Sequence, residues 1–416
     1  FFSIFFLFKI QKFIIFFVGF IIFIKIILSS NILLNKYKIN YFDFKYFFLK
    51  NKFLNLLIIL LLILFFFISV LPISDADSIS YHLNSIAHIF NYGIENKIDL
   101  NKNLEFSLLS NSEILLTFSI IFKSDNFGAL LNFSTLILFI IFFYKKKKLS
   151  LILLLSCPLI IFFVSTQKLQ LFFGLLYLFL FHVVHENKIK NNLDIFLFSL
   201  LLIFFSSGKL SYVILCAPLY VYFVFKNYYK LKKIIFYGTV SVFFIYFPIL
   251  LMKFFLFENP FSPILTSFYS NNKEIFDSLT YSLRATQGWL VNPQLSDFLL
   301  PFFPIKISQL SASLGLVFLL TFLNFSLQKK LFFIPLITIV LIISTGQLLP
   351  RYYLECFLVL TYYVSEKDKL LKFFSTIQIF FIIILTTIFV YNSYIKNNVI
   401  ISTKNYKINN SYSFAN

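Results

Sequence analysis

Long apolar runs separated by short polar segments recur along most of the chain. A helix needs about 20 apolar residues to cross a bilayer, and about twelve runs reach or approach that length. In chain order they are Phe13–Leu28, Phe53–Leu71, Phe127–Tyr144, Leu149–Ser165, Leu169–Val184, Leu193–Ser206, Leu210–Phe225, Ile234–Phe255, Leu310–Leu327, Leu331–Leu349, Tyr352–Val364 and Phe373–Tyr391. The pattern predicts an all-α polytopic membrane protein with about twelve transmembrane helices.

Basic and acidic residues fall into alternate loops between these runs. The lysines of one set of loops are Lys36, Lys38, Lys45, Lys50, Lys52, Lys145 to Lys148, Lys226, Lys230, Lys232, Lys233, Lys329, Lys330, Lys367, Lys369 and Lys372. Because positively charged loops stay in the cytoplasm, we predict that this side is cytoplasmic. The opposite side carries most of the acidic residues and two long loops, 74–126 and 256–309. We expect that side to face the periplasm of a bacterial inner membrane.

These features divide the chain into three parts. Residues 1–52 are predicted to hold an N-terminal helix and a basic cytoplasmic loop. Residues 53–365 form the transmembrane core with both external loops, and residues 366–416 form a last transmembrane helix and a polar tail. The chain begins with Phe1 and its only methionine is Met252, so we expect the natural start to lie upstream.

Composition supports a membrane protein and excludes some other classes. Hydrophobic residues make up 59% of the 416 residues, more than a soluble domain carries. The formal net charge of +19 would suggest nucleic-acid binding in a soluble protein, but lysines in short loops between apolar runs are explained by membrane topology. We therefore expect contact with membrane lipids and none with nucleic acid. The three cysteines lie inside apolar runs and predict neither a disulfide framework nor a metal site.

The first external loop opens with a segment in which two carboxylates, Asp75 and Asp77, directly follow an apolar run. From Asp77 onward the pattern is helical, with Ile79, Leu83, Ile86 and Phe90 on one side and Asp77, Tyr81, Asn84, Ser85 and His88 on the other. We predict an amphipathic juxtamembrane helix that lies flat on the membrane, apolar face down, and ends at Gly93. A second helical stretch, Leu104–Phe122, carries Glu113.

Asp77 is the residue that we expect to act as a general base, because a carboxylate at the lipid boundary suits a substrate that reacts at headgroup depth. An aspartate at the start of a helix often serves only as an N-cap, and Asp75 fits that role better. Tyr81, His82 and Glu113 are candidates for supporting roles, although Glu113 is equally explained as an exposed carboxylate. The spacing of His82 and the aspartates matches no tight metal-ligand motif, so we predict no metal and no cofactor, with a divalent cation as the alternative.

Arginine is rare in this chain and is therefore informative. Only Arg284 and Arg351 occur among 36 basic residues, and topology places both outside. A guanidinium group can donate two parallel hydrogen bonds to a phosphate, so we predict that both arginines bind a lipid phosphate. Lys209, in the short outer turn that contains Gly208, is a third candidate. The alternative for each is a basic side chain that extends to the membrane surface from a helix end.

The segment Asp77-Ser78-Ile79-Ser80-Tyr81-His82-Leu83 resembles the Asp-x-x-x-Tyr-His-Leu signature of bacterial polytopic glycosyltransferases of the GT-C superfamily, relatives of protein O-mannosyltransferases and of lipid A aminoarabinose transferase. Further segments resemble motifs of that superfamily in the same order. They are Ser107 to Phe118 with Glu113, Gly208-Lys209 with Ala217-Pro218, Glu258-Asn259-Pro260-Phe261, and Gln347 to Tyr353. The chain departs from the pattern in lacking an Asp-Glu pair, in having Glu258 before Asn-Pro, and in having no soluble C-terminal domain after Tyr391.

This resemblance implies a GT-C-like fold and a sugar transfer from a polyprenyl-phosphate donor to a lipid, glycan or protein acceptor. Asp77 would be the general base, Arg351 and Lys209 would stabilise the leaving phosphate, and direct displacement would invert the anomeric carbon. Two alternatives stay open. A transporter or flippase would place charged residues and broken helices near mid-membrane. An O-antigen polymerase or ligase would carry an arginine-rich external loop, whereas the loop 256–309 holds one arginine.

Overall fold

The computed structural model describes residues 52–73, 75, 77–93, 108–122, 124–144, 148–262, 302, 307–316, 321, 329–344, 349–364 and 369–395. Within these ranges every regular element is a helix, which confirms the all-α prediction. The chain divides into two compact units. Unit 1 comprises residues 1–38, 80–123 and 179–288, and unit 2 comprises residues 39–79, 124–178 and 289–416. The three-part division at residues 52 and 365 stays a prediction.

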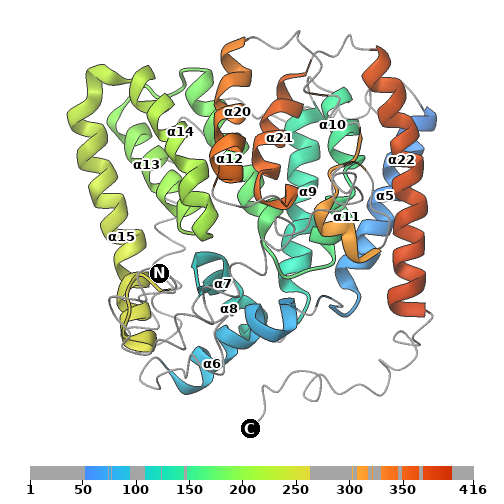
Figure 1. Ribbon diagram of the computed structural model, residues 1–416, viewed down its shortest axis with the longest axis horizontal. Helices are drawn as coiled ribbons and strands as arrows, with labels where there is room; N and C mark the ends of the chain where they lie inside the picture. Colours follow the sequence, from blue (N-terminus) through green and yellow to red (C-terminus); the bar gives the residue numbers. More distant parts are fainter. Residues whose placement is uncertain are drawn as a thin grey trace. The chain divides into compact units, whose positions relative to one another are not determined.

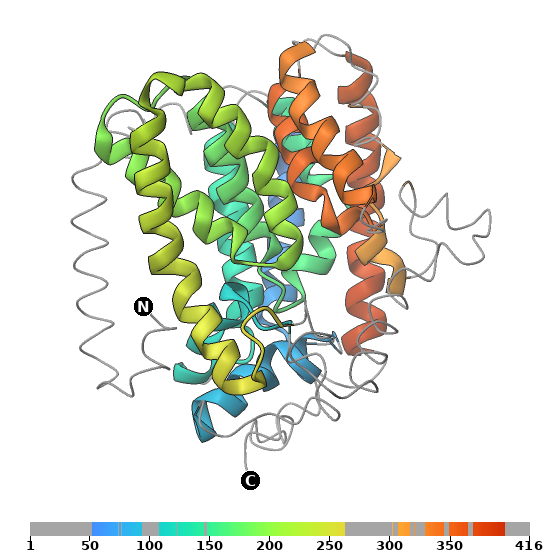
Figure 2. The same ribbon diagram turned by 60° about the vertical axis from the view of Figure 1, so that its left-hand side comes forward.

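Three long helices form most of the described part of unit 1. They are α13 (Asn192–Ser206), α14 (Leu210–Lys226) and α15 (Leu231–Phe257). Each follows one of the apolar runs of the sequence, and α13 packs against both α14 and α15, as Figure 2 shows for the green to yellow helices. The short helix η3 (Tyr228–Lys230) joins α14 to α15. The last turns of α12 (Gln170–His185) precede this group in the chain.

Polar side chains define the ends of these helices. Asn191 and Asp194 form a reciprocal capping box at the start of α13. At the other end of the group, α15 stops at Glu258, which adopts the left-handed conformation with φ 57°. Glycine adopts this conformation without steric cost. Glu258 therefore occupies a backbone conformation that favours glycine.

The helix predicted to lie on the membrane differs from expectation. Residues Ser78–Leu83 form a π-helix, η1, and α6 (Asn84–Tyr92) follows and ends at Gly93 as predicted. Ile86 and Ile89 of α6 belong to a buried cluster with Ile249, Met252 and Leu256 of α15. The apolar face of α6 therefore packs against the protein itself. Ser85, predicted on the polar face, is buried. A π-helix rotates less per residue than an α-helix, so η1 shifts the faces of the residues that follow it relative to a continuous α-helix.

The stretch Leu104–Phe122 is described from residue 108 onward and forms two short helices instead of one. These are α7 (Asn111–Leu115) and α8 (Thr117–Ile121), with a tight turn at Leu116 between them. Both pack against α6. In the described residues of the predicted external segment, α6, α7 and α8 therefore pack together within unit 1.

Unit 2 contains a larger set of helices. In chain order they are α5 (Lys52–Val70), α9 (Phe127–Tyr144), α10 (Lys148–Leu155), α11 (Leu159–Val164), the first turns of α12, η5 (Ile307–Ala312), α20 (Lys329–Ser344), η6 (Pro350–Tyr352), α21 (Leu354–Tyr363), α22 (Lys369–Val390) and η7 (Tyr391–Ile395). Figure 1 shows α5 and α22 side by side, and α22 also packs against α10. The central helices α10 and α11 are almost completely buried.

Two predicted spans of unit 2 are interrupted. The run Leu149–Ser165 is divided into α10 and α11 at Ser156, Cys157 and Pro158, because proline has no backbone N–H to donate to the preceding turn. The run Leu310–Leu327 begins as the 3-10 helix η5 and continues through an irregular segment at Ser313–Gly315. The prediction of one continuous helix is therefore wrong for the first run and for the described start of the second. The run Phe13–Leu28 lies outside the described residues.

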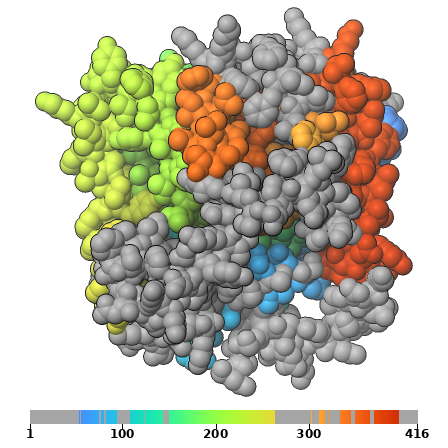
Figure 3. Space-filling model, in the orientation of Figure 1, coloured from blue at the N-terminus to red at the C-terminus, as the bar shows by residue number. Residues whose placement is uncertain are grey.

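Two helices in the described ranges are long and apolar enough to cross a membrane. They span Tyr228–Phe257 and Lys369–Ile395. Both expose large apolar side chains, such as Phe243 and Phe247 on α15 and Phe373 and Ile384 on α22. Figure 3 shows α22, in red, at the surface along its length. The other apolar helices are shorter when only their fully described residues are counted, with 10–17 residues each, so the expected number of spans stays a prediction.

Candidate functional site

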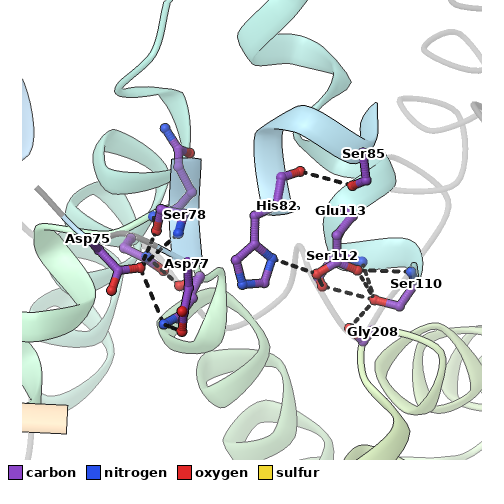
Figure 4. Close-up of polar contacts among 12 residues, drawn as sticks. Asp75, Asp77, Ser78, His82, Ser85, Ser110, Ser112, Glu113 and Gly208 are labelled. Carbon is purple, nitrogen blue, oxygen red and sulfur yellow. Dashed lines mark hydrogen bonds and ion pairs between the residues drawn. The ribbon is translucent and has the colours of Figure 1, made fainter. Parts of the chain in front are cut away.

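The segment after α5 holds the predicted base and its neighbours (Figure 4). Oδ2 of Asp75 accepts hydrogen bonds from the backbone N of Ser78 at 3.0 Å and from its Oγ at 2.6 Å. Asp75 therefore satisfies the first donors of the helical turn that begins at Asp77. Because Asp75 fills this capping role, the Asp77 carboxylate is not needed for it.

Lys168 links the two aspartates. Its Nζ lies 2.9 Å from Oδ2 of Asp77 and 3.3 Å from Oδ2 of Asp75. The lysine side chain is 13% exposed, whereas that of Asp77 is 52% exposed. We call Asp75, Asp77, Ser78 and Lys168 the carboxylate–lysine cluster. Its formal charge is −1 when both acids are ionised, and Asp77 is the member that solvent reaches most easily.

The turn that carries Lys168 also contacts Arg351. The Gln170 side-chain amide, in the first turn of α12, donates to the backbone O of Arg351 and, at 3.2 Å, to Oε1 of Glu355. The Arg351 guanidinium lies over the Tyr352 ring, 5.2 Å from its centroid. In unit 2 the Asp77 carboxylate therefore contacts Lys168, and the backbone of Arg351 contacts Gln170, two residues further along the chain.

Unit 1 contains a second polar cluster, built around Glu113. His82 Nδ1 lies 2.9 Å from Oε1 of this carboxylate, and Oγ of Ser112 donates to the same oxygen at 2.9 Å. Oε2 accepts from the backbone N of Ser110 at 2.9 Å and from its hydroxyl. We call His82, Ser110, Ser112 and Glu113 the histidine–glutamate cluster. Glu113 is 6% exposed, so the alternative of an exposed carboxylate is wrong.

The histidine–glutamate cluster is attached to the turn between α13 and α14. The backbone N of Asn111 donates to Ser207 O at 3.0 Å, and its side-chain amide donates to Ser207 Oγ at 2.6 Å. The hydroxyl of Ser110 lies 2.7 Å from Gly208 O. Lys209, a predicted phosphate ligand, is the next residue and precedes α14 in an extended conformation. Lys209 therefore lies between the anchored turn and Leu210, the first residue of α14.

Hydrogen bonding sets the charge of Glu113. Burial by itself would raise the pKa of this carboxyl group. The hydrogen bond and charge of His82, together with the hydroxyl groups of Ser110 and Ser112, outweigh burial and hold the pKa below its ordinary value of 4.5. Glu113 is therefore an ionised, fully engaged carboxylate at neutral pH, suited to orienting His82.

Some predicted site residues are not placed by the structure. Arg284 lies outside the described residues, and Tyr81 is described only as part of the backbone of η1. In the described ranges, no three His, Cys, Asp or Glu side chains form a group that could hold a metal ion. His82 contacts Glu113 as described above, and Asp77 contacts Lys168.

Sequence reasoning missed Lys168, Gln170 and Glu355. Lys168 lies in the short turn between the runs Leu149–Ser165 and Leu169–Val184, and strict alternation of spans puts that turn on the same side as Asp77. This signal was available in the sequence. The contact between Gln170 and Glu355 joins residues 185 positions apart, and no local pattern indicates it.

Comparison with known proteins adds no relative. No protein-family model matches the chain, and no curated protein and no solved structure matches it either.

Proposed function

We propose that this chain is a polytopic membrane glycosyltransferase of the GT-C type. It would transfer a sugar from a polyprenyl-phosphate donor to a lipid, glycan or protein acceptor at the periplasmic face of a bacterial inner membrane. The observation that carries the proposal is the Asp77 carboxylate. It is half exposed, it follows directly on the apolar helix α5, and it begins the Asp-x-x-x-Tyr-His-Leu segment.

In the proposed reaction Asp77 takes the proton from an acceptor hydroxyl group. The hydroxyl oxygen then forms a bond to the anomeric carbon, while the bond from that carbon to the lipid phosphate breaks and its electron pair leaves with the phosphate. This direct displacement inverts the configuration. The developing negative charge requires a fixed cation, and we propose Arg351 for this role because its backbone contacts Gln170, two residues after Lys168. Lys209 and Arg284 are the other proposed phosphate ligands.

A transporter or flippase is the second candidate function. Two observations favour it: α10 and α11 are separated by an interruption at Pro158, and Glu355 of α21 is a completely buried carboxylate. Broken helices and buried acids mark substrate pathways in transporters. The half-exposed Asp77 carboxylate favours the enzyme, because a general base must be accessible to the acceptor hydroxyl group.

The test is sugar transfer in proteoliposomes supplied with radiolabelled polyprenyl-phosphate sugars. Wild type is compared with Asp77→Asn, which keeps the shape of the side chain and removes the base, and with Glu186→Gln, an exposed acid at the end of α12. We expect Asp77→Asn to lose at least 100-fold in kcat and Glu186→Gln to keep full activity. Loss of transfer by a variant that still unfolds cooperatively, at a temperature well above that of the assay, supports the role of Asp77.

Two other outcomes point elsewhere. Equal transfer by wild type and Asp77→Asn would keep the enzyme and remove its proposed base. If wild type releases no polyprenyl phosphate from any donor, while a labelled lipid-linked sugar crosses the bilayer of the same vesicles, the transporter is the correct function.

A further inference from the structure

The turn between α11 and α12 is held in place from several sides within unit 2. The backbone N of Gln167 donates to Ser78 Oγ at 3.0 Å, and Oε1 of Gln167 accepts from the backbone N of Gly128 at 2.7 Å. Asn132 of α9 donates to the backbone O of both Phe163 and Lys168 at 2.8 Å. The backbone at Lys168 is therefore fixed relative to the segment that carries the two aspartates.

The Lys168 side chain is also confined. Its Nζ lies 4.8 Å from the centroid of the Phe162 ring and within ion-pair distance of both Asp75 and Asp77. An ammonium group that is mostly shielded from water interacts with its partners more strongly than one on the surface. The lysine therefore ties the Asp77 carboxylate to the fixed turn through a direct ion pair.

We infer that Lys168 is a positioning residue for Asp77, an inference that rests on the proposed function. It holds the carboxylate ionised and aimed by pairing with both aspartates, and it does not bind the phosphate of the donor. A phosphate approaching this ammonium would meet two carboxylates and a cluster of net negative charge, which repels an anion. The phosphate is therefore left to the arginine and lysine candidates outside this cluster.

The charged groups around Lys168 come from two other parts of unit 2. Asp75 and Asp77 face it from the segment after α5. Two residues further along, Gln170 contacts the backbone of Arg351 and the carboxylate of Glu355, at η6 and α21. Without Lys168, Asp75 and Asp77 would face each other without their shared cation, and the proton affinity of Asp77 would rise.

The first test measures sugar transfer against pH for the full chain in proteoliposomes. The variants are Lys168→Met, Lys168→Arg and a matched control, Lys372→Met, which changes an exposed lysine of α22 in the same unit. We expect Lys168→Met to lower kcat about 10- to 100-fold and to move the acidic limb of the profile about one unit to higher pH. Lys168→Arg should keep the position of the limb, and the control should match wild type. An unmoved limb in Lys168→Met overturns the inference.

The second test needs no activity and so separates this inference from the proposed function. It compares the unfolding temperature of wild type, Asp77→Asn, Lys168→Met and the double variant at neutral pH. We expect Asp77→Asn to lower the unfolding temperature of the wild-type chain, because an ion pair is lost. In the Lys168→Met background, Asp77→Asn should instead raise the unfolding temperature, because it removes one of two carboxylates that repel each other. Additive shifts would overturn the positioning role even if the protein transfers sugar.

Discussion

The Nδ1 atom of His82 lies 2.9 Å from Oε1 of Glu113, and both side chains are buried. The two residues are 31 positions apart, and the pair joins the π-helix η1 to the first turn of α7. Glu113 is at the same time the third residue of α7 and completes its capping box with Ser110. One carboxylate thus fixes a histidine and a helix start.

Glu113→Gln is expected to lower the stability at neutral pH by about 2 kcal/mol, because the charged hydrogen bonds to the buried carboxylate are lost. The pKa of Glu113 lies below its ordinary value of 4.5 in the folded protein. The carboxylate therefore stabilises the fold above that pH, and the contribution is lost as the pH falls through the folded-state pKa. The unfolding temperature of the two proteins in detergent should converge at acid pH. Glu186→Gln should follow wild type at every pH, and a constant gap between wild type and Glu113→Gln would contradict the assignment.

Gly128→Ala is expected to destabilise the protein by about 2 kcal/mol. A Cβ at Gly128 would collide with Oε1 of Gln167 and lie 2.9 Å from its backbone Cα. The backbone of that turn is fixed by Ser78 and Asn132, so it has little freedom to move away. The turn carries Lys168, so the variant should also lower sugar transfer.

Gly238→Ala is the matched control for this glycine. A Cβ at Gly238, inside α15, would meet only the Tyr220 hydroxyl, at 3.9 Å. Alanine is a better helix former than glycine, so the variant should be as stable as wild type or more stable by up to about 1 kcal/mol. Thermal unfolding followed by circular dichroism measures both variants. Equal changes in the unfolding temperature of Gly128→Ala and Gly238→Ala would contradict the close approach of Gln167 to Gly128.

Ser110→Ala should lower stability by about 1 kcal/mol, the usual cost of losing an N-cap side chain. Its hydroxyl group contacts Glu113 and lies 2.7 Å from Gly208 O, so its loss also loosens the attachment to the turn before α14. Ser344→Ala, which removes an exposed hydroxyl group bonded within α20, is the control. Chemical unfolding in mixed micelles would measure the difference, and equal stability of the two variants would rule out the cap.

If the proposed function holds, Arg351→Gln and Lys209→Gln are each expected to raise KM for the polyprenyl-phosphate sugar about tenfold, because each would remove one proposed charged contact to the phosphate. Arg351→Lys should restore affinity only in part, since an ammonium group cannot form two parallel hydrogen bonds. Lys233→Gln, an exposed lysine that contacts Asn192, should leave KM unchanged. If all variants share the KM of wild type, these residues do not bind the donor.

Local sequence patterns predicted the helical class, the position of most of the described helices and the stop of α6 at Gly93. These features depend on local patterns, since apolar periodicity and a residue with positive φ act within one or two turns. The sequence also selected Asp77, His82, Glu113, Lys209 and Arg351 as residues of interest, because polar residues at the ends of apolar runs stand out in a chain of this composition.

The contacts among these residues could not be predicted from the sequence, because they depend on how distant segments pack. The ion pairs of Lys168 with Asp75 and Asp77, the contact of Gln170 with Glu355 and the pair His82–Glu113 each join distant parts of the sequence. The apolar face of α6 was predicted to rest on the membrane. An amphipathic pattern is the same whether lipid or protein covers the apolar face, so the sequence could not distinguish the two. The packing of Ile86 and Ile89 against α15 decided in favour of protein, since burial depends on what lies opposite and not on the helix alone.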